Sequence, residues 1–153
     1  MKRDTARAII LTENNNSVYL LYRKRKVDNK FLTYYAIPGG KIEKNETIEE
    51  AVKRELQEEF SVTIELLGYL GENKTPYGID YHFHAKIING IPKLGGEEKE
   101  QNNENNYYEI KKIPLKDLTK DNINILPLNI SYIEKAIKKE YKKILNWTPF
   151  NGQ

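Results

Sequence analysis

The order of apolar and polar residues along the chain predicts a series of strands interrupted by two helices. Residues 77–88 alternate, with an aromatic or aliphatic side chain at every odd position, which is typical of a strand with one buried face. His82 and His84 fall on the opposite face and are expected to be ordinary polar-face residues. Short apolar or aromatic runs predict further strands at residues 6–11, 18–25, 33–37, 62–70 and 107–113.

Polar and glycine-rich segments separate these strands. Residues 26–30 are expected to form a polar loop, and Pro38-Gly39-Gly40 is expected to break any regular element. Residues 89–106 form a long polar stretch, and loops of that length in compact domains are usually functional or mobile.

Apolar residues at helical spacing predict the two helices. The first covers residues 48–60, where Thr47 followed by Glu50 fits a capping box. The second is expected at residues 131–146, with Ile133 and Ala136 inward and five lysines outward. The inward stripe of the first helix is predicted to be Ile48, Ala51, Val52, Leu56 and Phe60.

Composition narrows the class of protein. A chain of 153 residues predicts one domain, residues 1–153, of α/β or α+β class. The absence of cysteine excludes disulfides, iron–sulfur centres and a thiol nucleophile, and it fits the reducing cytoplasm. A net charge of +3 does not indicate a nucleic-acid partner or an anionic membrane, and no run is long and apolar enough for a signal peptide or membrane span.

The charge is unevenly distributed. Residues 41–60 hold seven acids against four bases, which is net −3, so the remainder of the chain carries +6. Three of these acids, Glu55, Glu58 and Glu59, share an arc of about 100° that borders the apolar stripe of the first helix. Like charges at these spacings destabilise a helix by about 0.2–0.5 kcal/mol per pair, and Arg54 can offset only part of that. A divalent cation such as Mg²⁺ would relieve the repulsion, whereas a solvated acidic face does not account for acids beside the core.

One segment resembles the Nudix box, the signature of the Nudix hydrolase superfamily. Eight of its nine specified positions match, and Ser61 stands where the family has glycine. The family glycine ends the helix in the left-handed conformation, so Ser61 is expected to cost about 1 kcal/mol of strain without removing a ligand. The matching segment reads Gly40-x5-Glu46-x7-Arg54-Glu55-Leu56-x-Glu58-Glu59-x-Ser61-Val62.

The resemblance implies a fold and an activity. The implied fold is an α/β/α sandwich with a central mixed β-sheet, in which the box forms a loop, a helix and a loop. The implied enzyme, similar to the MutT-like group of small bacterial Nudix proteins, uses Mg²⁺ or Mn²⁺ to hydrolyse a pyrophosphate (phosphoanhydride) bond. Its small-molecule substrate would be a nucleoside diphosphate derivative, such as a normal or damaged nucleoside triphosphate, ADP-ribose or a nucleotide sugar.

The resemblance also assigns roles by position in the box. Arg54 would orient Glu55 or Glu58 through an ion pair, so these three residues are the implied catalytic set. Glu46 would help to hold the start of the helix, and Gly40 would let the backbone approach. The implied metal ligands are Glu55, Glu58, Glu59 and the carbonyl of Gly39.

A general base or further metal ligand is expected in the long polar loop. Glu98 is the first candidate and Glu104 the second, and the alternative for each is a solvated loop acid. Arg23 and Arg25 alternate on one face of strand 18–25, where the family can bind phosphates, although they equally fit a surface basic run.

Aromatic and amide side chains are candidates for contacts with a base or sugar. Tyr35 stands where many family members carry tryptophan, and Asn129 precedes the predicted last helix at a place where oxidised-dGTP hydrolases present an asparagine. The alternatives are a core aromatic residue and an ordinary neighbour of a helix cap. Other aromatic residues that could stack on a ligand are Phe31, Tyr34, Tyr77 and Tyr81.

Three functions compete at this point. A metal-dependent hydrolase retains the box glutamates, a non-catalytic sensor of nucleotide ligands commonly loses them, and a bare acidic interaction helix needs no metal. All the box glutamates are present, which favours the hydrolase. The sequence does not distinguish among the substrates that share the box, or between a monomer and a homodimer.

Overall fold

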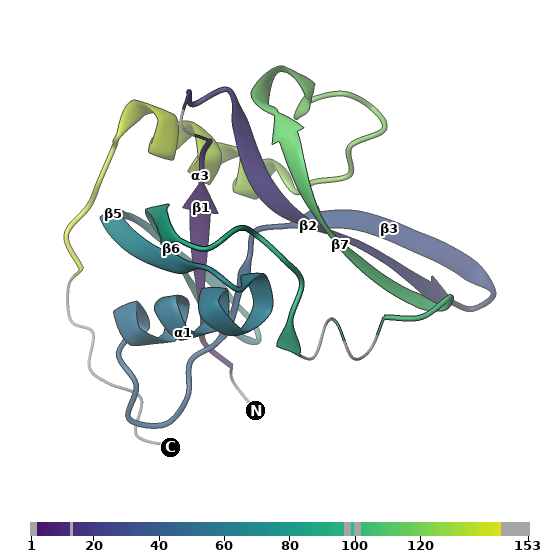
Figure 1. The fold of residues 1–153 in the computed structure, drawn as a ribbon, viewed down its shortest axis with the longest axis horizontal. Helices are drawn as coiled ribbons and strands as arrows, with labels where there is room; N and C mark the ends of the chain where they lie inside the picture. Colours follow the sequence, from purple (N-terminus) through teal and green to yellow (C-terminus); the bar gives the residue numbers. More distant parts are fainter. Residues whose placement is uncertain (1–2, 13, 97–98, 100–101, 145–153) are drawn as a thin grey trace.

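The structure is a computed structural model and describes residues 3–12, 14–96, 99 and 102–144 (Figure 1). Strands dominate the described part of the chain, and two α-helices lie after the fourth and seventh strands. In chain order the elements are β1 (Thr5–Ile10), β2 (Ser17–Val27), β3 (Lys30–Ala36), β4 (Gly39–Lys41), α1 (Ile48–Phe60), β5 (Thr63–Thr75), β6 (Gly78–Asn89), β7 (Asn106–Pro114), the 3-10 helix η1 (Leu115–Asp117) and α3 (Pro127–Lys138).

The strands form two sheets. The first is mixed, in the order β4-β1-β6-β5, because β1 pairs parallel with β6 and antiparallel with β4. The second is antiparallel, in the order β3-β2-β7. Helices α1 and α3 lie on opposite sides of the mixed sheet (Figure 1), so the predicted α/β/α sandwich is confirmed.

Alternation along β1 distributes its side chains between the two layers. Ala6, Ala8 and Ile10 pack in the core cluster that contains the inward face of α1. Ile9 belongs to the second cluster, which contains the inward face of α3 and residues of β2. Because successive strand residues point to opposite faces, Arg7 is on the same side as Ile9.

Helix α1 begins and ends as the sequence predicts. Thr47 Oγ1 accepts a hydrogen bond from the backbone N–H of Glu50, and Glu50 Oε1 accepts one from the N–H of Thr47, both at 3.0 Å. Ser61 follows the helix in the left-handed region, with φ 59°, and its backbone N–H donates to Leu56 O. Its hydroxyl donates to Lys93 O at 3.0 Å, which partly offsets the strain of a non-glycine residue there.

The expectation of a polar loop at residues 26–30 is wrong. β2 continues to Val27 and β3 begins at Lys30, so only Asp28 and Asn29 connect them. Both have positive φ, 51° and 65°, which is the conformation of a tight two-residue hairpin turn. Most of the last residues of β2 are charged and show no apolar strand pattern, because this half of the strand extends beyond the core and needs no apolar side chains.

The expectation that Pro38-Gly39-Gly40 breaks all regular structure is also wrong. Gly39 and Gly40 belong to the short strand β4, which pairs with β1 through Arg7↔Gly39 and Thr5↔Lys41. Gly39 has φ 146°, and a Cβ there would overlap the carbonyl oxygen of Ala6. Glycine is therefore required because the two backbones approach closely.

The last helix is displaced from its predicted position at residues 131–146. Pro127 starts α3, where its fixed φ favours the first helical turn, and Lys139, with φ 55°, ends it. Tyr141 follows the helix rather than belonging to it, while the predicted end, Leu145 and Asn146, lies outside the described residues. Among the described residues, no helix has the length and hydrophobicity needed to cross a membrane.

Two predictions about β6 need correction. Its alternate aromatic face is buried as expected at Tyr81 and Phe83, but Tyr77 precedes the strand and is 76% exposed. His82 and His84, expected on a polar face, are only 2% and 5% exposed because α3 and the segment after it cover that side of the sheet.

Candidate functional site

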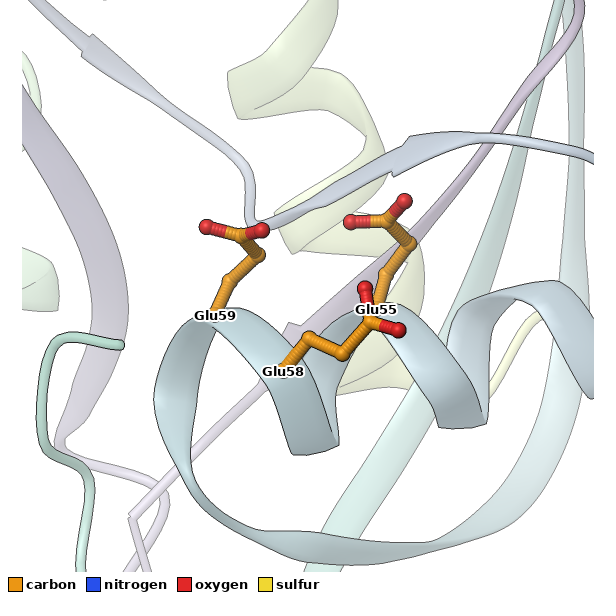
Figure 2. A group of neighbouring side chains, drawn as sticks. All are labelled: Glu55, Glu58 and Glu59. Carbon is orange, nitrogen blue, oxygen red and sulfur yellow. The ribbon is translucent and has the colours of Figure 1, made fainter. Parts of the chain in front are cut away.

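The central feature of the site is a cluster of three carboxylates on α1. Glu55, Glu58 and Glu59 leave the same side of the helix (Figure 2), and one oxygen from each lies within 4.8 Å of the others. Their i, i+3 and i+4 spacing accounts for this proximity. The structure therefore brings together the three acids that the box designates as metal ligands.

Arg54 connects the cluster to the start of the helix. Its Nη1 lies 3.1 Å from Glu55 Oε1 and 3.2 Å from Glu58 Oε2, and its Nε lies 2.7 Å from Glu46 Oε2. Its Nη2 donates to Lys41 O at 2.8 Å, so the guanidinium also attaches the helix to β4. The hydrogen bond with Glu46 raises the pKa of Arg54 despite partial burial.

Glu46 is held in its charged form by the same contacts. Partial burial alone would raise its pKa, but the hydrogen bonds from Arg54 and from the backbone N–H of Glu43 outweigh burial and lower it. Glu46 Oε1 accepts the Glu43 N–H at 3.0 Å, which closes the loop before α1. Asn45 adopts φ 63° in that loop, as the tight turn requires.

Gly40 allows β4 to pass directly beneath the cluster. A Cβ at this position would lie 2.6 Å from the carboxylate carbon of Glu55, so a side chain here would displace that carboxylate. The preceding residue, Gly39, provides the backbone carbonyl that the box resemblance adds to the metal ligands. The glycine pair thus positions bare backbone against the acidic face of α1.

The carboxylate cluster fits a divalent cation. Glu59 Oε2 is buried and has no hydrogen-bond partner in the described part of the protein. Gly95 N–H donates to the backbone carbonyl of Glu59 at 3.0 Å, which places Gly96 beside the side chain: a Cβ at Gly96 would lie 2.9 Å from Glu59 Oε1. A buried carboxylate oxygen without a partner, beside two further carboxylates, is the all-oxygen donor set that hard divalent cations prefer.

A pocket of about 410 Å³ lies between the mixed sheet, the edge of β3 and the start of α3. Tyr35 and Asn129, the two predicted contacts for a base, both line it, and Asn129 belongs to the first turn of α3 rather than preceding the helix. The remaining lining residues are Arg7, Leu32, Tyr34, Ala36, Ile37, Asn73, Asp80, His82, Asn124, Leu126 and Leu128.

Arg7, Asp80 and His82 also line the pocket, although the sequence pattern does not indicate them as ligand contacts. The signal for Arg7 was a single charge inside the apolar run of the first strand. Its Nη1 donates to Ile37 O at 2.9 Å. Burial lowers the pKa of Arg7, and the nearby charges of Asp80 and Glu55 partly oppose that effect.

The two arginines of β2 are placed differently from each other. Arg23 Nη1 donates to the hydroxyl of Tyr34, a pocket residue, at 3.0 Å, and its guanidinium lies 4.7 Å from the ring centre of Tyr108. Its Nε is buried and has no partner among the described residues. Arg25 is exposed and does not line the pocket.

The two candidates for a general base belong to the segment between β6 and β7. Glu98 lies outside the described residues, so its role stays a prediction. Glu104 is exposed in the turn before β7 and is not a member of the carboxylate cluster.

Comparison with known proteins gives a consistent result. Residues 1–128 match the family model described as NUDIX domain. The chain is 34% identical over 96 residues to an ADP-ribose pyrophosphatase of Methanocaldococcus jannaschii, covering 59% of this chain and 55% of that protein. It is 31% identical over 120 residues to an oxidized purine nucleoside triphosphate hydrolase of Danio rerio, covering 74% of this chain and 68% of that protein.

Solved structures share the fold. A NUDIX-family hydrolase from Clostridium perfringens aligns with a TM-score of 0.68 at 19% identity, over 91% of this chain and 98% of that one. The sequence match to the Methanocaldococcus jannaschii pyrophosphatase spans little more than half of that relative's length.

Proposed function

This chain belongs to the NUDIX family, and from that premise we propose that it hydrolyses a pyrophosphate bond in a nucleoside diphosphate derivative. The observation that carries the proposal is the carboxylate cluster of Glu55, Glu58 and Glu59, held by Arg54 against β4. An acidic helix that served only as a solvated face would not enclose a carboxylate oxygen without a partner.

The three glutamates, with the carbonyl of Gly39, would hold Mg²⁺ or Mn²⁺, both of which accept oxygen ligands. When bound, the cation supplies Lewis-acid polarisation of the phosphoryl oxygens and neutralises the negative charge that develops on them. Arg54 keeps Glu55 and Glu58 in fixed orientations, so the donor atoms need little rearrangement on binding.

The neighbouring pocket would hold the nucleoside. It offers the aromatic ring of Tyr35, the amide of Asn129 and apolar side chains from β3 and α3, a combination typical of small-molecule sites. Arg23 would approach the phosphates from the direction of Tyr34. The relatives are named for ADP-ribose and for oxidised purine nucleoside triphosphates, and both are candidate substrates here.

The test is a substrate panel with purified full-length chain and Mg²⁺ or Mn²⁺. ADP-ribose, 8-oxo-dGTP, the normal nucleoside triphosphates, nucleotide sugars and dinucleoside polyphosphates are incubated separately, and the phosphate-containing products are quantified by chromatography. Metal-dependent release from at least one substrate, lost in Glu58→Gln, is expected. Binding of a nucleotide without turnover under any condition would overturn the enzymatic assignment and favour a ligand sensor.

A further inference from the structure

Resting on the proposed function, we propose that Arg7 and Asp80 select the nucleobase. The base is one that carries a keto oxygen and an amino group on the same edge. Guanine and cytosine share this edge, whereas adenine lacks the keto oxygen and uracil and hypoxanthine lack the amino group.

The two charged groups lie on neighbouring strands at the pocket floor. β1 and β6 pair in parallel, with Thr5 opposite Asp80 and Arg7 opposite His82, on the side of the sheet that faces α3. Thr5 Oγ1 donates to Asp80 Oδ1 at 2.6 Å and so holds that carboxylate in place. In the part of the chain that the structure describes, Arg7 and Asp80 form no ion pair within 4.0 Å, so neither group is neutralised by direct contact with the other.

Arg7 has hydrogen-bond donors left for a ligand. A guanidinium carries five N–H groups, and the contact with Ile37 O uses one nitrogen of Arg7. Among the described residues, no guanidinium nitrogen of Arg7 is both buried and without a hydrogen-bond partner. Arg7 lines the pocket, so a ligand there would lie beside the donors that the contact with Ile37 O leaves unused.

His82 adds a neutral polar atom beside them. Its ring stacks on Tyr132, with centroids 3.9 Å apart and planes 10° apart, and its Nδ1 is buried without a partner in the described structure. Burial holds the pKa of His82 at about 3, so the ring is neutral at physiological pH. Arg7 and Asp80 thus supply a cationic donor and an anionic acceptor at the floor, and the neutral ring of His82 adds no charge beside them.

The walls of the pocket favour a flat ring standing with its edge on this floor. Leu32, Ile37 and Leu128 supply apolar surface, and Tyr35 supplies an aromatic ring. Enzymes that bind single bases read the base edge by hydrogen bonds and cover its faces with aromatic and apolar side chains. A sugar would instead need polar partners around its whole perimeter.

The donor and acceptor pattern determines which edge fits. A guanidinium donates to keto oxygens, and a carboxylate accepts from amino groups. Asp80 Oδ1 already accepts from Thr5, so a base that lacks the amino group would lose the hydrogen bond to the remaining acceptor capacity of this carboxylate and would bind more weakly. The same reasoning applies to Arg7 when the keto oxygen is absent.

The experiment measures binding of nucleoside monophosphates to the full chain in EDTA by titration calorimetry. Two matched ligand pairs isolate the amino group: GMP against IMP, and CMP against UMP. We expect GMP or CMP to bind about 10- to 100-fold more tightly than its partner, and AMP to bind weakly. GMP above CMP identifies the purine as the ligand, and the reverse order identifies the pyrimidine.

Two variants assign the selection to residues. Asp80→Asn replaces a carboxylate, which only accepts hydrogen bonds, by an amide, which also donates them. This variant is expected to abolish the preference for GMP over IMP or for CMP over UMP. Arg7→Met is expected to remove the disadvantage of AMP. Glu65→Gln, an exposed carboxylate paired with Lys86 on the outer strand β5, is the charge-matched control and should change neither preference.

The results separate this inference from the proposed hydrolysis, because binding is measured without metal or turnover. Equal affinity for the members of both ligand pairs in the unchanged protein overturns the inference even if hydrolysis is observed. Equal affinity for ribose 5-phosphate overturns it in favour of a sugar site. Retained selectivity in folded Asp80→Asn, with folding verified by circular dichroism, removes Asp80 from the assignment.

Discussion

Arg54 and Glu46 form a short ion pair, 2.7 Å between Nε and Oε2, that joins the metal-site helix to the loop before it. The same guanidinium donates to two carboxylates of the cluster, so one side chain helps to orient both Glu55 and Glu58.

Replacing Arg54 by lysine should therefore impair activity more than it impairs folding. Lysine keeps the charge but cannot donate in a fork to several partners. We expect kcat/KM to fall by about 10- to 100-fold, because displaced carboxylates hold the reacting groups less accurately. The concentration of Mg²⁺ needed for half-maximal activity should rise in parallel.

Lys53→Gln is the matched control for that prediction, because Lys53 is the exposed neighbour on the other side of α1. An Arg54→Lys enzyme with unchanged metal requirement and unchanged kcat/KM would contradict the positioning role.

Glu59→Gln should have opposite effects with and without metal. In EDTA, removal of one of three crowded carboxylates should raise Tm, because like charges at these spacings repel. With excess Mg²⁺, the unchanged protein should gain more stability than the variant, because a ligand stabilises the state that binds it. Differential scanning fluorimetry at several Mg²⁺ concentrations measures both effects.

Glu134→Gln serves as the control for Glu59→Gln, since Glu134 is exposed on α3 and outside the cluster. A variant Glu59→Gln that responds to Mg²⁺ as strongly as the control would exclude this residue from the metal ligands.

Ser61→Gly should stabilise the protein. Ser61 has φ 59°, and a non-glycine residue in the left-handed region costs about 1 kcal/mol. Loss of the hydrogen bond from its hydroxyl to Lys93 O subtracts from this gain, so we expect an increase of about 0.5 kcal/mol in the free energy of unfolding, measured in urea.

Lys139→Gly provides a comparison at a second left-handed helix end, φ 55°, which has no such side-chain bond in the described contacts. Its stabilisation should be the larger of the two. A destabilised Ser61→Gly would show that the hydroxyl contact outweighs the backbone strain.

Stability should fall as the pH drops from about 6.5 toward 5. In the folded protein the pKa of His82 is lowered from 6.5 to about 3 by burial, whereas the unfolded chain takes up the proton near 6.5. The unfolded state therefore binds more protons in this window, and the free energy of unfolding decreases by about 1.4 kcal/mol per pH unit for one such group.

Urea unfolding at pH 7, 6 and 5 tests this, with His82→Phe as the variant that keeps a ring against Tyr132. The variant should show a shallower pH dependence. Its slope will not reach zero, because burial also lowers the pKa of His84. Identical slopes in both proteins would show that His82 titrates normally when folded.

The extent of agreement between sequence and structure differs from element to element. Helix α1 was predictable to the residue, because its cap, apolar stripe and terminating residue are all local signals. Helix α3 was misplaced because the apolar and lysine pattern continues past Lys139, and only the left-handed backbone at that residue ends the helix.

The functional site likewise has one part that local sequence spacing predicts and one part that it does not. Glu55, Glu58, Glu59 and Arg54 lie within one helical segment, so their spacing along the chain determines their proximity. The sequence by itself also determined the family resemblance and the alternation of the strands.

Only the tertiary structure decided what surrounds that helix. Arg7 and Asp80 are 73 positions apart and line one pocket because β1 pairs in parallel with β6. β3 and α3 bring Tyr35 and Asn129 to the same pocket. Strand pairing and the side of the sheet covered by a helix depend on long-range packing, which leaves no local pattern in the chain.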